Sequence, residues 1–263
     1  MVLLSLDSID YQTTWNLKEQ QIVNIQDAIA LVTGANRGIG YAFVNGLLQA
    51  GVTKVYATAR KIDSLTAVTA LDPRRVIPLQ LDVTNHSLVH ALPSQAPDVN
   101  LLINNAGILA FGNILEVPTE TISSQFNTNF YGSLNMARAF VPVIERNNGG
   151  AIVNILTLVA LASMPGLAVY NASKAAAWSM TQSLRASVAA KGIAVHGVFP
   201  GAVDTQMLAG VDMPKTSPAD IVKAVLLGIE AGQEDIFPDP MSDRVYTAWR
   251  QDHKAIEKQF ATM

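Results

Sequence analysis

The sequence of 263 residues predicts an α/β protein, one doubly wound domain whose mostly parallel sheet has seven strands and helices on both faces. Short apolar runs alternate with longer segments of helical periodicity from residue 27 onward, and no repeat or linker-like stretch divides them. A glycine-rich loop follows the first apolar run, as expected where a parallel strand turns into its crossover helix. With 49% hydrophobic and 15% charged residues, the chain can bury a substantial core.

The seven predicted strands are 29–32, 55–57, 76–81, 101–104, 151–155, 194–198 and 235–237. The third contains Pro78, which cannot donate to a sheet ladder, so we expect this strand at an edge. Helical periodicity predicts helices over 39–50, 119–144, 170–191 and 217–231, the last with Ser217 as its N-cap. We expect a peripheral helix in the tail 241–263. Residues 1–26 are interpreted as a leader outside the domain 27–263, either a flexible arm or a clasp on a neighbouring subunit.

Composition excludes several functional classes. The net charge of −3 and the lack of a long basic cluster argue against a nucleic-acid partner. No cysteine is present, so disulfide and thiolate chemistry are excluded. We expect no membrane partner and a cytoplasmic location, because no apolar stretch approaches ~18 residues and the N-terminus does not resemble a signal peptide. His86 and His90 have helical spacing, but no further metal ligand is apparent, so a solvated helix face is favoured and no metal is predicted.

The glycine loop contains Gly34, Gly38 and Gly40 between a strand and a helix. Gly34 permits a tight turn, Gly38 lets backbone amides approach a pyrophosphate, and Gly40 allows close packing of helix and strand. The spacing differs from the G-x-G-x-x-G dinucleotide fingerprint, so a glycine-rich turn without a ligand remains the alternative.

Tyr170 and Lys174 are four residues apart, which places them on one face of the predicted helix. An ammonium beside a phenol favours the phenolate, so we expect the pKa of Tyr170 to lie below its ordinary value of about 10. A tyrosine with a lowered pKa can act as a proton donor near neutral pH.

Five motifs in order resemble the short-chain dehydrogenase/reductase family over residues 27–240: Thr33-Gly34-x-x-x-Gly38-x-Gly40, Asn104-Asn105-Ala106-Gly107, Asn129, Tyr170-x-x-x-Lys174 and Pro200-Gly201-x-Val203-x-Thr205. The resemblance implies a Rossmann-type domain in which Tyr170 protonates a substrate carbonyl as hydride arrives. Lys174 would hold the nicotinamide ribose, and Asn129 would hold a water connecting Lys174 to solvent. A solvated Lys174 and an Asn129 that only caps a kink are the alternatives. Helices 119–144 and 170–191 would form a homodimer or homotetramer.

Thr157 departs from the family pattern, in which a serine usually polarises the substrate carbonyl. Threonine keeps the hydroxyl but adds a methyl group and restricts χ1. The hydrogen bond is therefore retained in a narrower site, or the site is weakened by a misplaced hydroxyl. The implied catalytic residues are Asn129, Thr157, Tyr170 and Lys174.

The cofactor is predicted to be NADP(H) rather than NAD. NAD binding uses an acid at the end of the second strand, whereas this chain has Arg60 there and no acid before Asp63. Arg37 lies inside the glycine loop, and two arginines suit a 2′-phosphate. Asp82 and Val83 resemble the pair that contacts adenine. The predicted cofactor-binding residues are Gly34, Asn36, Arg37, Gly38, Ile39, Gly40, Arg60, Asp82, Val83, Asn105, Ala106, Gly107, Tyr170, Lys174, Pro200, Gly201, Val203 and Thr205.

Positions that face the substrate in this family are apolar here: Leu109, Phe111, Leu156, Val159, Met164, Leu167 and Met207. The lining predicts a small hydrophobic ketone or aldehyde, and the short segment 207–216 predicts an open pocket. The implied function is an NADPH-dependent carbonyl reductase, also able to oxidise the alcohol. The alternative is a dinucleotide-binding regulator whose turnover is weak or absent because of Thr157. A dehydratase or epimerase fits poorly, because those relatives usually have a different glycine spacing and a larger C-terminal portion.

Overall fold

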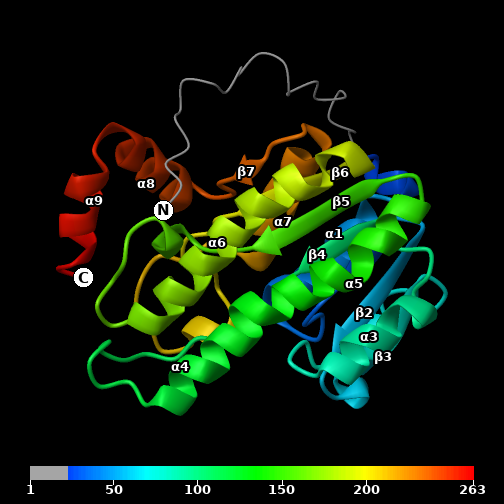
Figure 1. Cartoon of the computed structure of the whole chain (residues 1–263), viewed down its shortest axis with the longest axis horizontal. Coiled ribbons are helices and arrows are strands. Elements are labelled where there is room, and N and C mark those ends of the chain that lie inside the picture. Colours follow the sequence, from blue (N-terminus) through cyan, green and yellow to red (C-terminus); the bar gives the residue numbers. More distant parts are fainter. Residues whose placement is uncertain (1–22) are drawn as a thin grey trace, which may run out of the picture.

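The computed structural model describes residues 23–263 and has a parallel sheet at its centre (Figure 1). The strand order is β3-β2-β1-β4-β5-β6-β7, and every neighbouring pair is parallel. The strands are β1 (Ile29–Val32), β2 (Lys54–Ala59), β3 (Val76–Gln80), β4 (Leu101–Asn104), β5 (Gly150–Ile155), β6 (Ile193–Val198) and β7 (Asp235–Ile236). The predicted doubly wound fold is confirmed, and β3, which contains Pro78, lies at an edge.

Helices cover both faces of the sheet (Figure 1). They are α1 (Gly38–Gln49), α2 (Thr66–Thr69), α3 (His86–Gln95), α4 (Thr119–Phe126), α5 (Ser133–Arg146), α6 (Ala168–Val188), α7 (Pro218–Glu230), α8 (Pro240–Gln251) and α9 (His253–Phe260). On β1, Ala30 and Val32 pack in the cluster with α1 and α7, whereas Leu31 packs with α3 and α5. Successive side chains of the strand point to opposite faces of the sheet and so pack into two separate cores. Both cores are apolar because helices cover both faces.

The single helix predicted over 119–144 is wrong in its middle. A π-helical segment, η4 (Asn127–Gly132), separates α4 from α5. Single π-helical turns are frequent at functional sites. Here the segment places Asn129 in the interior and Gly132 against Val83, where an added Cβ would lie 2.7 Å from a Val83 methyl carbon.

Residues at both ends of the described range pack more closely than the sequence suggested. Val23 and Ile25, which belong to the predicted leader, are buried in the core with α1 and α7. Residues 1–22 of that leader lie outside the described residues, and its role stays a prediction. The tail forms two helices, α8 and α9, rather than one.

Asp239 and an aromatic stack attach α8 to the core. The buried Asp239 carboxylate caps α8 and also accepts from the Gly201 amide at 2.8 Å. Phe237 stacks on Tyr246 of α8, with ring centroids 3.9 Å apart, and Trp249 donates to the Leu161 carbonyl at 3.1 Å. These contacts fix α8 beside the segments that follow β5 and β6.

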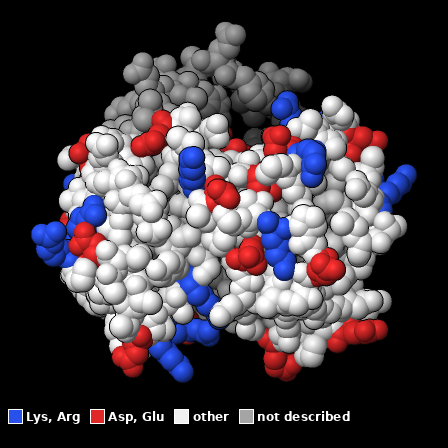
Figure 2. Space-filling view, turned by 180° about the vertical axis from the view of Figure 1, so that it is seen from behind, with Lys and Arg blue, Asp and Glu red and all other residues white. Residues whose placement is uncertain are grey.

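The charged surface has no region of one sign on the face seen in Figure 2, where acidic and basic side chains are interspersed. His86 and His90 are exposed on α3, in agreement with the solvated helix face that was predicted. Within residues 23–263, every helix is too short or too polar to cross a membrane.

Gly150 at the start of β5 provides a test of the fold. Its φ is 152°, and an added Cβ would lie 1.9 Å from the Asn100 carbonyl oxygen. We expect Gly150→Ala to lower the free energy of unfolding by about 2–4 kcal/mol through backbone strain and overpacking. Gly166→Ala is the control, because nothing lies within 4 Å of its added Cβ. Equal urea midpoints for the two variants would contradict this account of β5.

Candidate active site

The loops that follow β1 and β4 are joined at the point where the strand order reverses. In open parallel sheets, ligands bind in the crevice at this switch point. The buried Thr33 hydroxyl accepts from the Asn105 and Ala106 amides, each at 2.9 Å. The Asn105 side-chain amide donates to the Thr33 carbonyl at 2.8 Å. Thr33 belongs to the first motif but was assigned no role of its own, although a hydroxyl directly before the glycine loop was an available signal.

The glycine loop has the geometry of a dinucleotide cradle. Gly34 and Gly38 have φ of 65° and 54°, in the region that favours glycine. An added Cβ on Gly40 would lie 2.1 Å from the Gly34 carbonyl oxygen, so only glycine lets α1 begin this close to the loop. The backbone of the loop therefore remains accessible at the start of α1, as a pyrophosphate group requires.

A cavity of about 1350 Å³ extends from the glycine loop to the C-terminal helices. Apart from Gly40, all predicted cofactor-binding residues line it. The predicted substrate residues also line it: Leu109, Phe111, Leu156, Val159, Met164, Leu167 and Met207. The structure thus brings into one cavity residues that follow six different strands, β1 to β6.

Tyr170 and Lys174 of α6 lie buried beside Thr157, which follows β5. The side chains of Tyr170 and Thr157 are hydrogen-bonded. The Thr157 hydroxyl oxygen also accepts from the Val159 amide at 3.4 Å. The Lys174 ammonium donates to the Ile155 carbonyl at 2.7 Å and lies 5.9 Å from the centroid of the Tyr170 ring. A hydroxyl pair and an ammonium therefore meet at one end of the cavity.

Burial dominates the acid–base properties of this group. It raises the pKa of Tyr170 to about 12, and the hydrogen bond with Thr157 only partly offsets it. Burial also lowers the pKa of Lys174 to about 8. The prediction that Lys174 lowers the pKa of Tyr170 is wrong for the protein by itself, because desolvation of the phenolate is the largest influence and Thr157, not Lys174, partly offsets it. Tyr170 is consequently protonated at neutral pH and can donate.

Asn129 lies behind this group and does not line the cavity. Its side chain accepts from the Ile108 amide at 2.9 Å, donates to the Ile108 carbonyl at 3.0 Å and donates to the Ser173 hydroxyl at 2.9 Å. These contacts hold the loop after β4 against α6 at the π-helical segment. The predicted water relay through Asn129 stays a prediction.

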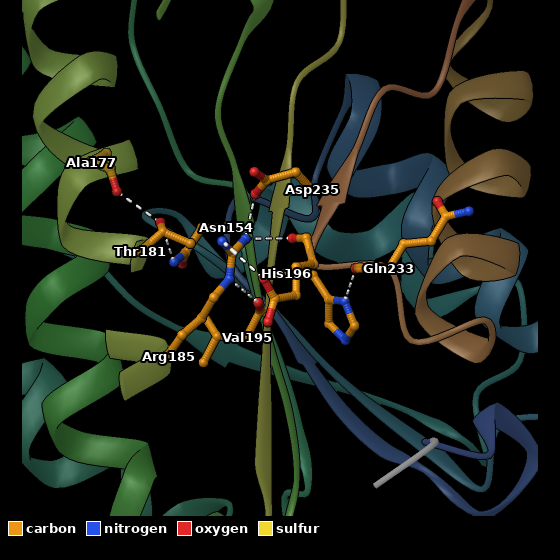
Figure 3. A network of polar contacts seen from close by, with 9 residues as sticks. Asn154, Ala177, Thr181, Arg185, Val195, His196, Gln233 and Asp235 are labelled. Carbon is orange, nitrogen blue, oxygen red and sulfur yellow. Dashed lines mark hydrogen bonds and ion pairs between the residues drawn. The ribbon is translucent and has the colours of Figure 1, made fainter. Parts of the chain in front are cut away.

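A polar network fixes α6 to the sheet (Figure 3). Asn154 of β5 donates to the Thr181 hydroxyl at 3.0 Å, and Arg185 donates to the Val195 carbonyl at 2.9 Å and pairs with Asp235 of β7. His196 is buried in β6, with one ring nitrogen 2.5 Å from the Gln233 carbonyl. Because buried polar groups are costly when unpaired, the network favours one position of α6 on the sheet.

The C-terminal helices complete the cavity, a role that the sequence did not indicate. Ile256 and Phe260 of α9 are buried in one cluster with Val159 and Tyr170. Helices α8 and α9 form a wall on this side, whereas Phe111 and Met207 of the lining are exposed, so the predicted open pocket stays a prediction. The four-residue spacing of Ile256 and Phe260 predicts an apolar helix face, but it does not indicate what that face covers.

Two arginines lie at the other end of the cavity. Arg37 donates to the Gln206 side chain at 2.8 Å, and Arg60 directly follows β2. Both are exposed and line the cavity. The Asp82 carboxylate, which also lines it, accepts from the Thr84 amide at 2.9 Å and from its hydroxyl at 2.7 Å. In residues 23–263, His, Asp and Glu side chains form no group of three that could hold a metal.

A dinucleotide cradle that shares its cavity with a buried tyrosine, lysine and threonine defines a class of nicotinamide-dependent oxidoreductases. The family model for short chain dehydrogenase matches residues 28–215. An uncharacterized oxidoreductase of Staphylococcus aureus strain N315 is 33% identical over 215 residues, covering 78% of this chain and 92% of the relative. The chain therefore belongs to the short-chain dehydrogenase family.

Solved structures agree with this assignment. A short chain dehydrogenase from Burkholderia cenocepacia J2315 in complex with NADP has a TM-score of 0.85 and 38% identity, over 90% of this chain and 98% of that one. A short chain dehydrogenase/reductase from Burkholderia phymatum in complex with NAD has a TM-score of 0.79 and 25% identity, over 90% and 96%.

Lys174 makes the stability of the protein depend on pH. Its folded pKa of about 8 lies below its ordinary value of 10.5, so between these values the unfolded chain binds more protons. We expect the free energy of unfolding of the wild type to rise from pH 8 to pH 10 relative to Lys174→Met. The raised pKa of Tyr170 acts in the opposite direction, but only above its ordinary value of 10.0.

Urea denaturation at several pH values measures this difference. Lys223→Met is the matched control, because Lys223 is exposed on α7 and should leave the wild-type profile unchanged. Parallel pH profiles for the wild type and Lys174→Met would show that Lys174 does not lose its proton early in the folded protein.

Proposed function

We propose that this protein is an NADPH-dependent reductase that converts a hydrophobic ketone or aldehyde to an alcohol, and that it also catalyses the reverse oxidation. The observation that carries the proposal is the buried Tyr170 hydroxyl, hydrogen-bonded to Thr157 in the cavity that contains the glycine loop. Tyr170 is protonated at neutral pH, as a proton donor must be, but its raised pKa makes it a weaker acid, so the transfer needs stabilisation of the tyrosinate.

When bound, the reduced nicotinamide supplies the hydride. The residues of the chain bind and protonate the substrate oxygen. The hydroxyl groups of Thr157 and Tyr170 donate hydrogen bonds to the carbonyl oxygen, and Tyr170 gives up its proton as negative charge develops there. Lys174 stabilises the resulting tyrosinate from its position over the ring, and its proton can replace the one that Tyr170 lost, because its pKa is about 8.

The preference for NADP(H) rests on the arginines at the glycine loop and after β2. The B. cenocepacia relative was solved with NADP and the more distant B. phymatum relative with NAD, so the choice depends on local residues. Arg37 and Arg60 line the cavity, and the first acid after β2 is Asp63, which does not. Two guanidinium groups would bind the 2′-phosphate.

The apolar lining supports a hydrophobic substrate. Val159 and Met164 follow β5, and Ile256 and Phe260 face them from α9 in one cluster around Tyr170. Water is poorly stabilised between such side chains, so an apolar ligand would be favoured there.

The alternative function, a regulator with negligible turnover, depends on a misplaced Thr157 hydroxyl. The hydrogen bond between Thr157 and Tyr170 favours the enzyme instead.

We also propose assembly into a homodimer or homotetramer, supported by the exposure of Tyr131 (50%) between α4 and α5. The cytoplasmic location stays a prediction.

Substitution of Tyr170 tests the proposed proton transfer. We expect Tyr170→Phe to lower kcat with lipophilic ketones about 10²- to 10⁴-fold, because only the donor hydroxyl is lost. NADPH oxidation measures turnover, and fluorescence titration measures cofactor affinity, which should change little. Thr157→Ser keeps the hydroxyl and serves as the control. Equal turnover of the wild type and Tyr170→Phe would contradict the mechanism, and tight NADPH binding without wild-type turnover would favour the regulator.

Reversal of the charge at Arg60 tests the cofactor preference. We expect Arg60→Asp to change the ratio of kcat/KM for NADPH over NADH about 10- to 100-fold in favour of NADH. The variant loses a charge-assisted bond to the 2′-phosphate and gains an acceptor for the ribose. Arg74→Asp makes the same charge change outside the cavity. If both variants alter the ratio equally, Arg60 does not bind the 2′-phosphate.

A further inference from the structure

We propose that Arg244 on α8 binds an anionic group of the substrate, so that the substrate is an oxo acid with an apolar body and a carboxylate distant from its carbonyl. This inference rests on the proposed function, because it assigns the substrate class of the same site. It also modifies the expectation, drawn from the apolar lining, of a small hydrophobic ketone or aldehyde.

Arg244 belongs to the face of α8 that lines the cavity. Met241, Arg244, Val245 and Ala248 are spaced as one helix stripe, and all four line it. Met241, Val245 and Ala248 also pack in the cluster around Tyr170. The guanidinium is therefore carried by the same wall that approaches the catalytic tyrosine.

The other charged side chains of the cavity have different places or partners. Arg37, Arg60 and Asp82 follow β1, β2 and β3, at the end that holds the dinucleotide, and Lys174 donates to the Ile155 carbonyl. Glu120 lies in the first turn of α4, which Figure 1 shows well separated from α8. Arg244 is thus the cation that the described chain places at the substrate end of this cavity.

Within residues 23–263, the exposed Arg244 guanidinium has no carboxylate within ion-pair distance and makes no hydrogen bond, unlike those of Arg37, Arg75 and Arg185. Arg250 on the same helix differs, because its guanidinium lies over the Tyr246 ring, 5.8 Å from the centroid. The Arg244 guanidinium is therefore available for a ligand, whereas that of Arg250 is engaged by the protein.

The chemistry of this arrangement selects the ligand. A guanidinium presents a planar fork that binds a carboxylate through two parallel hydrogen bonds. Neighbouring apolar side chains such as Met241 and Val245 lower the local dielectric once a ligand excludes water, which strengthens the pair. The carboxylate does not react: the ketone gains a hydride and a proton and becomes a secondary alcohol, while the acid group only orients the molecule.

The test compares medium-chain oxo acids, each with a methyl ketone at the far end, with their methyl esters, using NADPH and several chain lengths. We expect the wild type to have a lower KM for the acid than for the ester at the chain length that places the carboxylate at Arg244 while the ketone lies at Tyr170. Arg244→Met should raise KM for the acid about 10-fold or more, with kcat and the ester parameters nearly unchanged. Arg244→Lys should be intermediate, since it keeps the charge but not the fork.

Arg250→Met is the matched control, because it removes the same charge from α8 outside the cavity and should leave the preference intact. Calorimetry of decanoate and methyl decanoate with the NADP-loaded protein gives a readout without turnover. Decanoate should bind more tightly, and only Arg244→Met should remove the difference. If the esters are reduced but Arg244→Met does not change KM for the acids, the inference is overturned and the proposed function still holds. Decanoate binding that depends on Arg244, with no turnover of any carbonyl, would support the anion site and refute the proposed function.

Discussion

The junction between the loops after β1 and β4 is the constraint on which the rest of the structure depends. Adjacent parallel strands there lead to crossovers on opposite faces of the sheet, and a crevice opens between them. The Thr33 hydroxyl accepts hydrogen bonds from two backbone amides of the β4 loop, and the Asn105 side chain donates to the Thr33 carbonyl. Gly40 has no space for a side chain, so α1 packs this closely against the loop and Asn105 only because this residue is glycine.

The group formed by Thr157, Tyr170 and Lys174 is positioned by contacts outside the cavity. Asn129 and Ser173 connect the β4 loop to α6, while Asn154 and Thr181 connect α6 to β5. Buried polar side chains lose much free energy if their partners separate, so these contacts resist sliding of the helix. Tyr170 therefore stays beside Thr157, although the two belong to different elements.

The same burial that orders the group also sets its chemistry. Charged forms are disfavoured in the interior, so Tyr170 keeps its proton and Lys174 releases its own more readily. The two shifts have opposite signs for an acid and a base, and together they lower the cost of passing a proton from lysine to tyrosine. The apolar wall of α8 and α9 contributes to this environment.

The sequence by itself determined the strands, the glycine loop, the Tyr170 and Lys174 pair and most residues of the cavity lining. Such features depend on local patterns, and the carboxyl ends of parallel strands always meet at one edge. Only the tertiary structure decided the π-helical turn that buries Asn129, the direction in which the pKa of Tyr170 shifts, and the position of α8 and α9 against the cavity. These features depend on packing between segments distant in the sequence, such as Tyr170 with Phe260, and no local pattern records which surfaces meet.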